Sequence, residues 1–446
     1  MTGSSAFMAI GQFFFCQILF FSFHANKPFV YGATLMETTK SHAPPSTCSG
    51  PERGLRIAHQ YGPCSPFSQT KSSPTSSQML LQDELRVQGF RSTMYDRRTS
   101  VGRRARQHFW GHSVGAGNYI VTVGFGTPTK NFNLILDTGS YITWVKNSLY
   151  DPSASSTSLN APCWPSCHYN QSYVDESFSF GLFVVDKIII QPSDVIPNFV
   201  FLRASKDSEG FGEAAGILGL GQGSNSIDDR YGNYSLISQT ATTFEKVFCH
   251  CLPTKENSTG YLYFGKEALE KCQNSGSYTP LLSNPSDPSP YYVNLIGITI
   301  GQKRLKISSA VSSTSSSSSP STIIDTGTVI TRLPRSVYSA LRSEFEKWMS
   351  DYPRARRDKI LDTCYDLRHY DNVAMPNMVL HFENLDVNLD QTAVTWKGKD
   401  RSQVCLAFAG NRNENDLTII GNHQQQKLNI FYNVQDRRIK IGPGNC

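Results

Sequence analysis

LILDTGSYITWV, residues 134–145, sets Asp-Thr-Gly-Ser at the end of an apolar run, and TIIDTGTVITRLP, residues 322–334, repeats the arrangement. A single Asp-Thr-Gly triplet indicates little, because surface turns favour these residue types and average usage gives one in roughly every tenth chain of this length. Two copies are different, since both follow apolar residues and both precede a hydroxyl residue. The repetition indicates a shared structure rather than two unrelated turns.

A second, shorter pattern follows each copy of the triplet. GILGLG, residues 216–221, comes after the first copy and TIIGN, residues 418–422, comes after the second, each some 80 to 100 residues later. Patterns that recur in the same order are the signature of internal duplication. The sequence therefore predicts two homologous halves, each built around one Asp-Thr-Gly turn.

The composition predicts a largely β protein. The 446 residues include 33 Gly and 23 Pro, and short alternating or apolar runs bounded by turn residues continue from residue 117 to the C-terminus. One helix is expected over residues 336–349, with Ser336 as its cap and a single apolar face. The serine-rich residues 308–322 are expected to form a surface loop.

The net charge of +6 is modest for a chain of this length. Much of it comes from arginines that precede the change in composition near residue 117, namely Arg97, Arg98, Arg103, Arg104 and Arg106. A short basic cluster in a polar segment is typical of a processing linker. We therefore expect no nucleic-acid partner.

The N-terminus and the cysteines predict an oxidising compartment. The chain is apolar from Ala6 to Phe23, which predicts a signal peptide over residues 1–25, with a signal anchor as the alternative. Ten of the eleven cysteines lie beyond this segment, and an even number in a secreted chain favours disulfides over zinc. Three glycosylation triplets agree with secretion, at Asn170, Asn233 and Asn257.

The paired turns suit a reaction that needs two carboxylates. Two such groups in one buried site cannot both ionise at low cost, so they hold one proton between them. The ionised member can take a proton from water while the protonated member donates to a carbonyl oxygen. Asp137 and Asp325 are thus the candidate catalytic residues, and the supporting positions are Thr138, Gly139, Ser140, Thr326, Gly327 and Thr328.

This arrangement resembles the pepsin-like aspartic endopeptidases, and within them a plant group that includes the nepenthesins and the chloroplast nucleoid protease type. The resemblance covers nearly the whole chain. It rests on the two Asp-Thr-Gly turns and on shorter segments, namely LRIAHQYGPCSPFS (55–68), GNYIVTVGFGTP (117–128), VFCHCLP (247–253), ILDTCYDL (360–367), VCLAFAGN (404–411) and IGPGNC (441–446).

The resemblance implies an all-β, bilobed pepsin-like fold with the active site between two duplicated lobes. It implies a signal peptide over 1–25, a propeptide over 26–110, an N-terminal lobe over 111–280 and a C-terminal lobe over 281–446. Tyr173 would be the flap tyrosine, with Trp144 beside it. The implied disulfides are Cys364–Cys405, Cys251–Cys446 and a local Cys163–Cys167 pair, with Cys249 and Cys272 as a possible extra bridge.

The function implied is hydrolysis of peptide bonds by an acid-active enzyme made as a zymogen. We expect a monomer that takes polypeptide substrates and needs neither a metal nor another cofactor. The expected compartment is the apoplast or the vacuole, with the chloroplast as the alternative. Two other functions stay open, a pepsin-fold binding or inhibitor-type protein with little or no catalysis, and a DNA-associated plastid protease.

The sequence also departs from the group it resembles. The flap carries Val174 and Glu176 where glycines are common, which predicts a stiffer hairpin. Tyr141 follows Asp-Thr-Gly-Ser in place of the common Asp, and the cysteine-rich insertion after Trp144 and Val145 is absent. Substrate selection by the N-terminal half is thus expected to differ from that of relatives.

Overall fold

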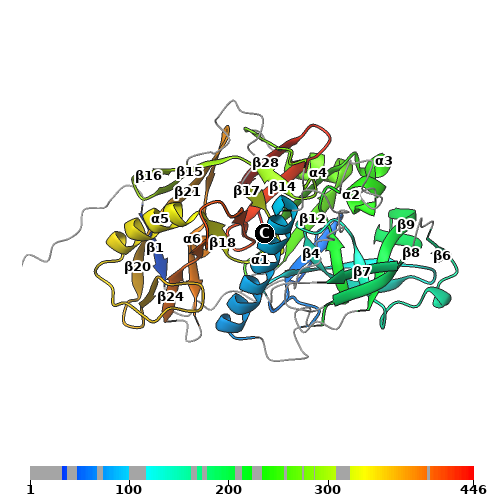
Figure 1. Cartoon of the computed structure of the whole chain (residues 1–446), viewed down its shortest axis with the longest axis horizontal. Helices are drawn as coiled ribbons and strands as arrows, with labels where there is room; N and C mark the ends of the chain where they lie inside the picture. Colours follow the sequence, from blue (N-terminus) through cyan, green and yellow to red (C-terminus); the bar gives the residue numbers. More distant parts are fainter. Residues whose placement is uncertain are drawn as a thin grey trace, which may run out of the picture. The chain divides into compact units, whose positions relative to one another are not determined.

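The computed structural model describes most of the chain from residue 48 onwards and one short strand before it. The residues that it describes are 33–37, 48–67, 74–99, 117–161, 168–172, 178–205, 213–223, 234–255, 259–273, 276–285, 287–307, 322–398 and 402–446. The expected signal peptide, most of the 308–322 loop and Tyr173 fall outside them. Figure 1 shows a chain made mostly of strands, as the composition predicts.

The first half contains most of the largest sheet. Its elements are β1 (Ala33–Glu37), β2 (Leu55–His59), α1 (Ser76–Thr99), β3 (Tyr119–Phe125), β4 (Lys130–Asp137), β5 (Trp144–Lys146), η1 (Pro152–Ala154), β6 (Leu159–Asn160), β7 (His168–Ser172), β8 (Phe178–Gln191), β9 (Asp194–Ser205), β10 (Gly216–Gly219), α2 (Leu236–Gln239), α3 (Ala241–Phe244), β11 (Val247–Cys251), β12 (Gly260–Phe264) and α4 (Gly265–Cys272).

The second half is divided among smaller sheets. Its elements are β13 (Thr279–Pro280), β14 (Tyr291–Val293), β15 (Leu295–Ile300), β16 (Lys303–Lys306), β17 (Thr322–Ile324), β18 (Thr331–Leu333), α5 (Arg335–Trp348), β19 (Cys364–Asp366), β20 (Asn372–Pro376), β21 (Met378–Phe382), β22 (Leu385–Asn388), α6 (Gln391–Val394), β23 (Thr395–Lys397), β24 (Gln403–Leu406), β25 (Phe408–Gly410), β26 (Thr418–Ile420), β27 (Leu428–Asn433) and β28 (Arg438–Pro443).

The predicted duplication is visible in the strand pairing. In the first half β4 pairs in parallel with β10, β10 pairs antiparallel with β5, and β5 pairs in parallel with β9. In the second half β17, β26, β18 and β25 follow the same order with the same alternation of directions. The two short patterns, GILGLG and TIIGN, thus form the strands that lie beside the two Asp-Thr-Gly strands.

One strand from the N-terminal segment lies inside the main sheet. β2 pairs antiparallel with β12 on one side and with β3 on the other. Its side chains are buried, with Ile57 at 0% and Ala58 at 2% exposure. β2 therefore connects β3 and the strands beyond it to β12 and β11 within one sheet. β11 in turn pairs with β27 of the second half.

Helix α5 agrees with the sequence except at its start. It spans Arg335–Trp348 and buries Val337, Leu341 and Phe345 on one face. Ser336 is not its cap, because the capping position is Pro334 and no side chain caps the helix. Ser336 lies in the first turn instead, where its backbone N–H and hydroxyl both donate to the Glu414 carboxylate.

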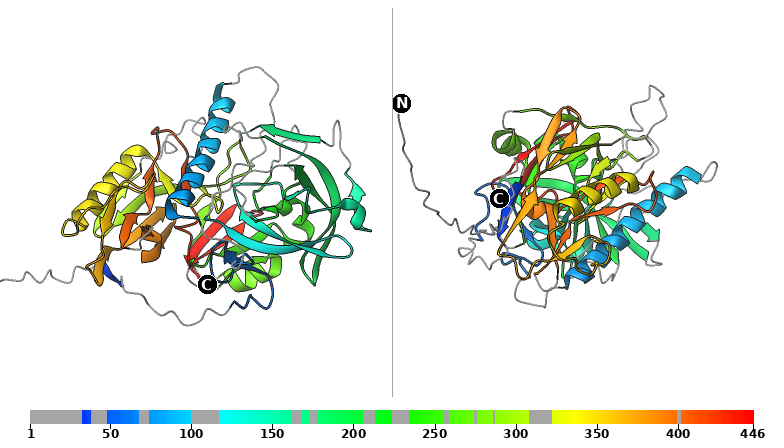
Figure 2. Two further views of the ribbon diagram at one scale, coloured as in Figure 1. Left: turned by 90° about the horizontal axis from the view of Figure 1, so that it is seen from below. Right: turned by 90° about the vertical axis from the view of Figure 1, so that its left-hand side faces the viewer.

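Helix α1 was not expected, because its segment is polar overall. It begins with a reciprocal cap, in which the Thr75 hydroxyl accepts from the Gln78 N–H and the Gln78 side chain accepts from the Thr75 N–H. Both views in Figure 2 show α1 running beside strands of both halves. No helix in the described part of the chain is long and apolar enough to cross a membrane.

Candidate active site

The two Asp-Thr-Gly turns meet at one buried point. Asp137 ends β4 and Asp325 directly follows β17, and both are fully buried. A Cβ atom placed on Gly139 would lie 2.6 Å from Asp325 Oδ1, and one on Gly327 would lie 2.6 Å from Asp137 Oδ1. Only glycine permits this approach, so each half provides the surface on which the other half's carboxylate rests.

Each carboxylate is held by equivalent donors from its own turn. Asp137 accepts from the Gly139 N–H at 2.9 Å and from the Ser140 hydroxyl at 2.6 Å. Asp325 accepts from the Gly327 N–H at 3.0 Å and from the Thr328 hydroxyl at 2.5 Å. The residues after each triplet therefore orient both side chains in the same way.

The two threonines join the turns across the interface between the halves. The Thr138 N–H donates to Thr326 Oγ1 and the Thr326 N–H donates to Thr138 Oγ1, each at 3.0 Å. The hydroxyls then donate to the carbonyls of Ile324 and Leu136. These reciprocal bonds tie the two turns together and so set the distance between the two aspartates.

A residue that sequence reasoning missed lies between the carboxylates. Arg86 of α1 is buried, and its guanidinium donates to both aspartates, with Nη2 at 2.9 Å from Asp137 Oδ1 and 3.1 Å from Asp325 Oδ2. Its Nη1 also lies 3.2 Å from Asp137 Oδ2. One cation from the N-terminal segment thus contacts both carboxylates.

The electrostatics of this cluster follow from burial and from Arg86. Burial raises the pKa of Asp137, but the charge of Arg86 and the Ser140 hydroxyl outweigh it, so that its pKa is lowered. Burial also raises the pKa of Asp325, and there the charge of Asp137 leaves the pKa raised despite Arg86. With Arg86 in place, the two carboxyls therefore differ in the direction of their pKa shifts.

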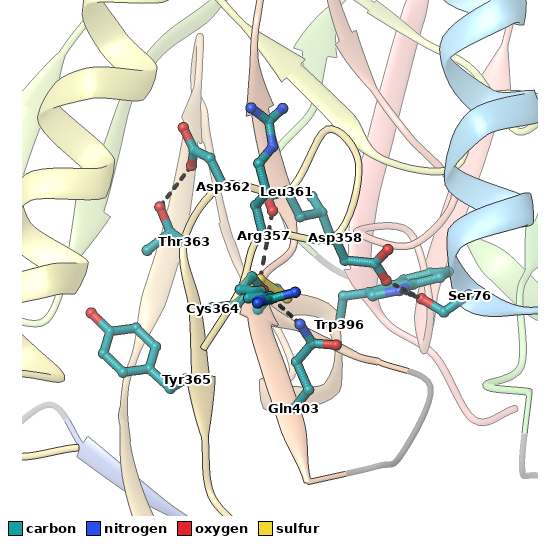
Figure 3. Close-up of a disulfide and its surroundings, with 12 residues drawn as sticks. Ser76, Arg357, Asp358, Leu361, Asp362, Thr363, Cys364, Tyr365, Trp396 and Gln403 are labelled. Carbon is teal, nitrogen blue, oxygen red and sulfur yellow. Dashed lines mark hydrogen bonds between the residues drawn. A yellow bond between two sulfur atoms is a disulfide. The ribbon is translucent and has the colours of Figure 1, made fainter. Parts of the chain in front are cut away.

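Helix α1 is anchored at three further places on the second half. Asp83 accepts from the Val329 N–H at 2.6 Å and the Ile330 N–H at 3.2 Å, and it pairs with Arg332 at 2.8 Å. Arg91 pairs with Asp416. Figure 3 shows the third anchor, where Ser76 bonds Asp358 and accepts from the Trp396 indole N–H.

A sequence signal for Arg86 existed but was weak. The Thr75-to-Gln78 spacing fits a helix cap, and Met79, Asp83 and Val87, all buried, recur every four residues. Two charged residues, Asp83 and Arg86, lie on the buried face of α1 and obscure this pattern. In the sequence alone, such residues indicate a face that is exposed to solvent. The partners lie more than 200 residues away in the Arg86–Asp325 and Asp83–Arg332 cases.

Of the other expected site residues, Trp144 is buried at the start of β5. The structure pairs Cys364 with Cys405 and Cys251 with Cys446, as the resemblance implies, and it forms the possible extra bridge between Cys249 and Cys272. It adds Cys48–Cys64, which closes a loop around β2 and was not foreseen. Tyr173, Cys163 and Cys167 lie outside the described residues.

Comparison with known proteins identifies the family. Models described as the xylanase inhibitor N-terminal and C-terminal domains match residues 119–266, in two overlapping parts, and residues 290–443. An aspartyl protease family protein of Arabidopsis thaliana is 34% identical over 434 residues, covering 88% of this chain and 87% of the relative. The chain belongs to the plant pepsin-like aspartic protease family. Within this family, the aspartyl protease AED1 of the same plant is 34% identical over 85% of this chain and 84% of its own.

Solved structures agree with this pepsin-like family at the level of fold. The protein titled edgp superposes with a TM-score of 0.59 at 18% identity, covering 73% of this chain and 92% of its own. Conglutin gamma, a basic 7S globulin from lupine seeds, gives a TM-score of 0.59 at 17% identity, covering 74% and 92%. The predicted all-β, pepsin-like fold is confirmed.

Among the residues that the structure describes, Asp137 and Asp325 are the two buried carboxylates that meet at the site. In those residues no group of three or more His, Cys, Asp or Glu side chains is placed to hold a metal ion. The two buried histidines near the sheet centre, His59 and His250, bond Tyr61 and Gln425 rather than the dyad. The donors that contact the aspartates are hydroxyls, backbone N–H groups and Arg86.

Proposed function

We propose that this chain is an aspartic endopeptidase that is made as a zymogen. The observation that carries the proposal is the buried pair Asp137 and Asp325, one from each duplicated half, held by equivalent hydroxyl and backbone donors. Both carboxylates are present, and once Arg86 has left they can hold one proton between them.

The reaction would use the pair as a unit. A water molecule between the carboxyls would lose a proton to the ionised member as its oxygen attacks the peptide carbonyl carbon. The protonated member would donate its proton to the carbonyl oxygen, giving a neutral tetrahedral diol. Collapse of the diol would break the C–N bond, with a proton passing to the leaving amine. The acid optimum that we expect follows from the need for one proton on the pair.

The N-terminal segment supports the zymogen part of the proposal. Arg86 occupies the position between the carboxyls that water and the scissile bond would need. Its own pKa is raised by the two carboxylates despite burial, so it stays charged at every physiological pH. Release of α1, with residues 26–110 acting as the propeptide, is then the step that creates activity.

A binding protein of the same fold is the rival function. The family models that match carry xylanase inhibitor names, and one structural neighbour is titled a seed globulin. In this chain both aspartates and their donors are intact, and this favours catalysis. We also propose passage through the secretory pathway, because four disulfides are formed among the described residues.

The test of catalysis is substitution of each aspartate in the full chain. Asp137→Asn and Asp325→Asn should each lower the cleavage of a denatured protein by at least a thousandfold after acid treatment, and the double variant should be no worse. Asp186→Asn, which removes another buried Asp of the N-terminal half, is the matched control and should stay active. Residual activity within tenfold of wild type in either single variant would show that the pair is not the catalytic dyad.

A further inference from the structure

The second half contains a receptor for a carboxylate one helical turn from the dyad. Three donors converge on the Asp83 side chain: the Val329 N–H at 2.6 Å, the Ile330 N–H at 3.2 Å and Arg332 Nη2 at 2.8 Å. We call these three groups the carboxylate socket. Asp83 is fully buried and Arg332 is 0% exposed, so the contact is dry.

The socket is built by residues that do not belong to α1. Arg332 Nη1 donates to the carbonyl of Ile330 at 2.7 Å, which fixes the guanidinium against the loop that supplies the two N–H groups. Its Nε is buried and has no hydrogen-bond partner among the described residues. The donors would thus keep their arrangement when Asp83 leaves.

Every ionic partner of Arg332 in the described part of the chain comes from α1. These partners are Asp83 and, at 3.4 Å, Glu84. If α1 left, both carboxylates would leave with it. The guanidinium of Arg332 would then face the space that α1 had filled. A guanidinium with two adjacent backbone N–H groups is the donor set that carboxylates prefer.

The position of Arg332 in the socket corresponds to that of Trp144 in the other half. Arg332 lies opposite Ile419 on β26 in the register in which Trp144 lies opposite Ile217 on β10. Both residues stand seven positions after their catalytic aspartate. The C-terminal half therefore presents an arginine where the N-terminal half presents the tryptophan that we expect beside the flap.

We propose that the carboxylate socket binds an acidic side chain, Asp or Glu, of the polypeptide substrate. This rests on the proposed protease function. Asp83 and Arg86 are three residues apart in a helix, which separates them by about 4.5 Å along the axis. An extended peptide advances about 3.3 Å per residue, so the acidic residue lies one or two positions from the scissile bond.

The first experiment tests the socket in the full chain and needs no catalysis. Asp83→Ala leaves space for a small anion, so sodium formate should raise its Tm by several degrees more than it raises that of wild type, at ionic strength matched with sodium chloride. Asp83→Ala combined with Arg332→Gln should lose this extra rise. Equal rises in all three proteins would show that no socket exists.

The second experiment tests its use by the activated enzyme. Peptides that differ only in Glu against Gln are compared at each of three positions on either side of the cut. Glu one or two residues from the cut should raise kcat/KM at least tenfold over Gln, and Arg332→Gln should bring this ratio close to one. Arg412→Gln is the matched control, because Arg412 pairs with Glu84 of α1 but does not contact Asp83, and it should keep the ratio.

The outcomes separate the two proposals. A preference that is absent at all six positions, or that survives in Arg332→Gln, overturns the acidic subsite while leaving the protease function intact. A chain that cleaves no peptide contradicts the protease function and with it the subsite. The formate experiment still decides in that case whether the anion receptor exists.

Discussion

At the scale of single residues, a small number of side chains determines the geometry and the charge of the site. The duplicated turns place Asp137 and Asp325 at equivalent positions. The reciprocal hydrogen bonds of Thr138 and Thr326 fix the spacing of the two turns. Arg86 contributes a positive charge to a point where two carboxylates would otherwise repel. The cost of burying three charged groups is met only while all three are together, since an uncompensated buried charge is expensive.

Substitution of Arg86 should therefore weaken latency. In the full chain, Arg86→Met leaves two buried carboxylates without a cation, a loss of about 3–5 kcal/mol in the docking of α1. We expect the uncut chain to hydrolyse a fluorogenic peptide at least tenfold faster than uncut wild type at the same mildly acidic pH. Mass spectrometry of the reaction at each time point shows whether the chain is still whole.

The control for this substitution is on the same helix. Arg91→Met removes a pair with Asp416 and Glu84 but no contact to the dyad. It should change latency much less than Arg86→Met. Equal effects of the two substitutions would mean that α1 inhibits by bulk alone and that the Arg86 contacts add nothing.

At the scale of elements, β2 carries a built-in response to acid. His59 is its last residue, buried beside Tyr119, and its Nδ1 accepts from the Tyr61 N–H. Burial, followed by the charges of Lys255 and His423, lowers the pKa of His59 to about 3. Protonation would break that bond and place a cation in a site where no carboxylate contributes to the shift.

The direction of this pH dependence follows from the lowered pKa. Above about pH 6.5 the imidazole is neutral in both the docked and the released strand, so docking is at full strength. As the pH falls from about 6.5 towards 3, the released strand binds the proton and the docked strand does not. Docking then weakens by up to about 1.4 kcal/mol per pH unit.

His59→Gln should shift the acid-induced loosening of β2 within the sheet to lower pH, because glutamine can accept from the Tyr61 N–H but does not titrate. The measurement is hydrogen exchange of β2 amides in the full chain, followed from pH 7 to pH 3. His369→Gln, a change at an exposed histidine, is the control and should leave the midpoint in place. An unchanged midpoint in His59→Gln would remove the residue from the acid response.

What the sequence could predict at the element scale depended on local signals. Periodic or repeated sequence patterns mark the strands that lead to Asp-Thr-Gly, the neighbouring strands β10 and β26, and helix α5. The sequence predicts all of these elements. Ser336 does not cap α5, because its hydroxyl donates to the carboxylate of Glu414, which lies far away in the sequence. Helix α1 failed because its buried face carries Asp83 and Arg86, whose partners a local pattern does not reveal.

At the scale of the whole molecule, the two halves and the N-terminal segment depend on one another. β11 and β27 join the halves, and β2 lies between β12 and β3 in the same sheet. The Cys48–Cys64 disulfide closes the chain around β2, and Cys251–Cys446 ties the C-terminus to β11. The N-terminal segment is thus part of the packed core as well as the source of Arg86.

The place of β2 has a consequence for what cleavage of the backbone produces. β2 is held by pairing with two neighbouring strands and by the loop that the Cys48–Cys64 disulfide closes, whereas α1 is held by side-chain contacts of Ser76, Asp83, Arg86 and Arg91. Cuts on both sides of α1, within 68–73 and within 100–116, would free the helix and leave residues 48–67 in the sheet. The active enzyme would then be a heterodimer of a short peptide and the catalytic chain. Native mass spectrometry of acid-activated protein should find the two together, and denaturing gels should separate them; a single chain under both conditions would show that the strand departs with the helix.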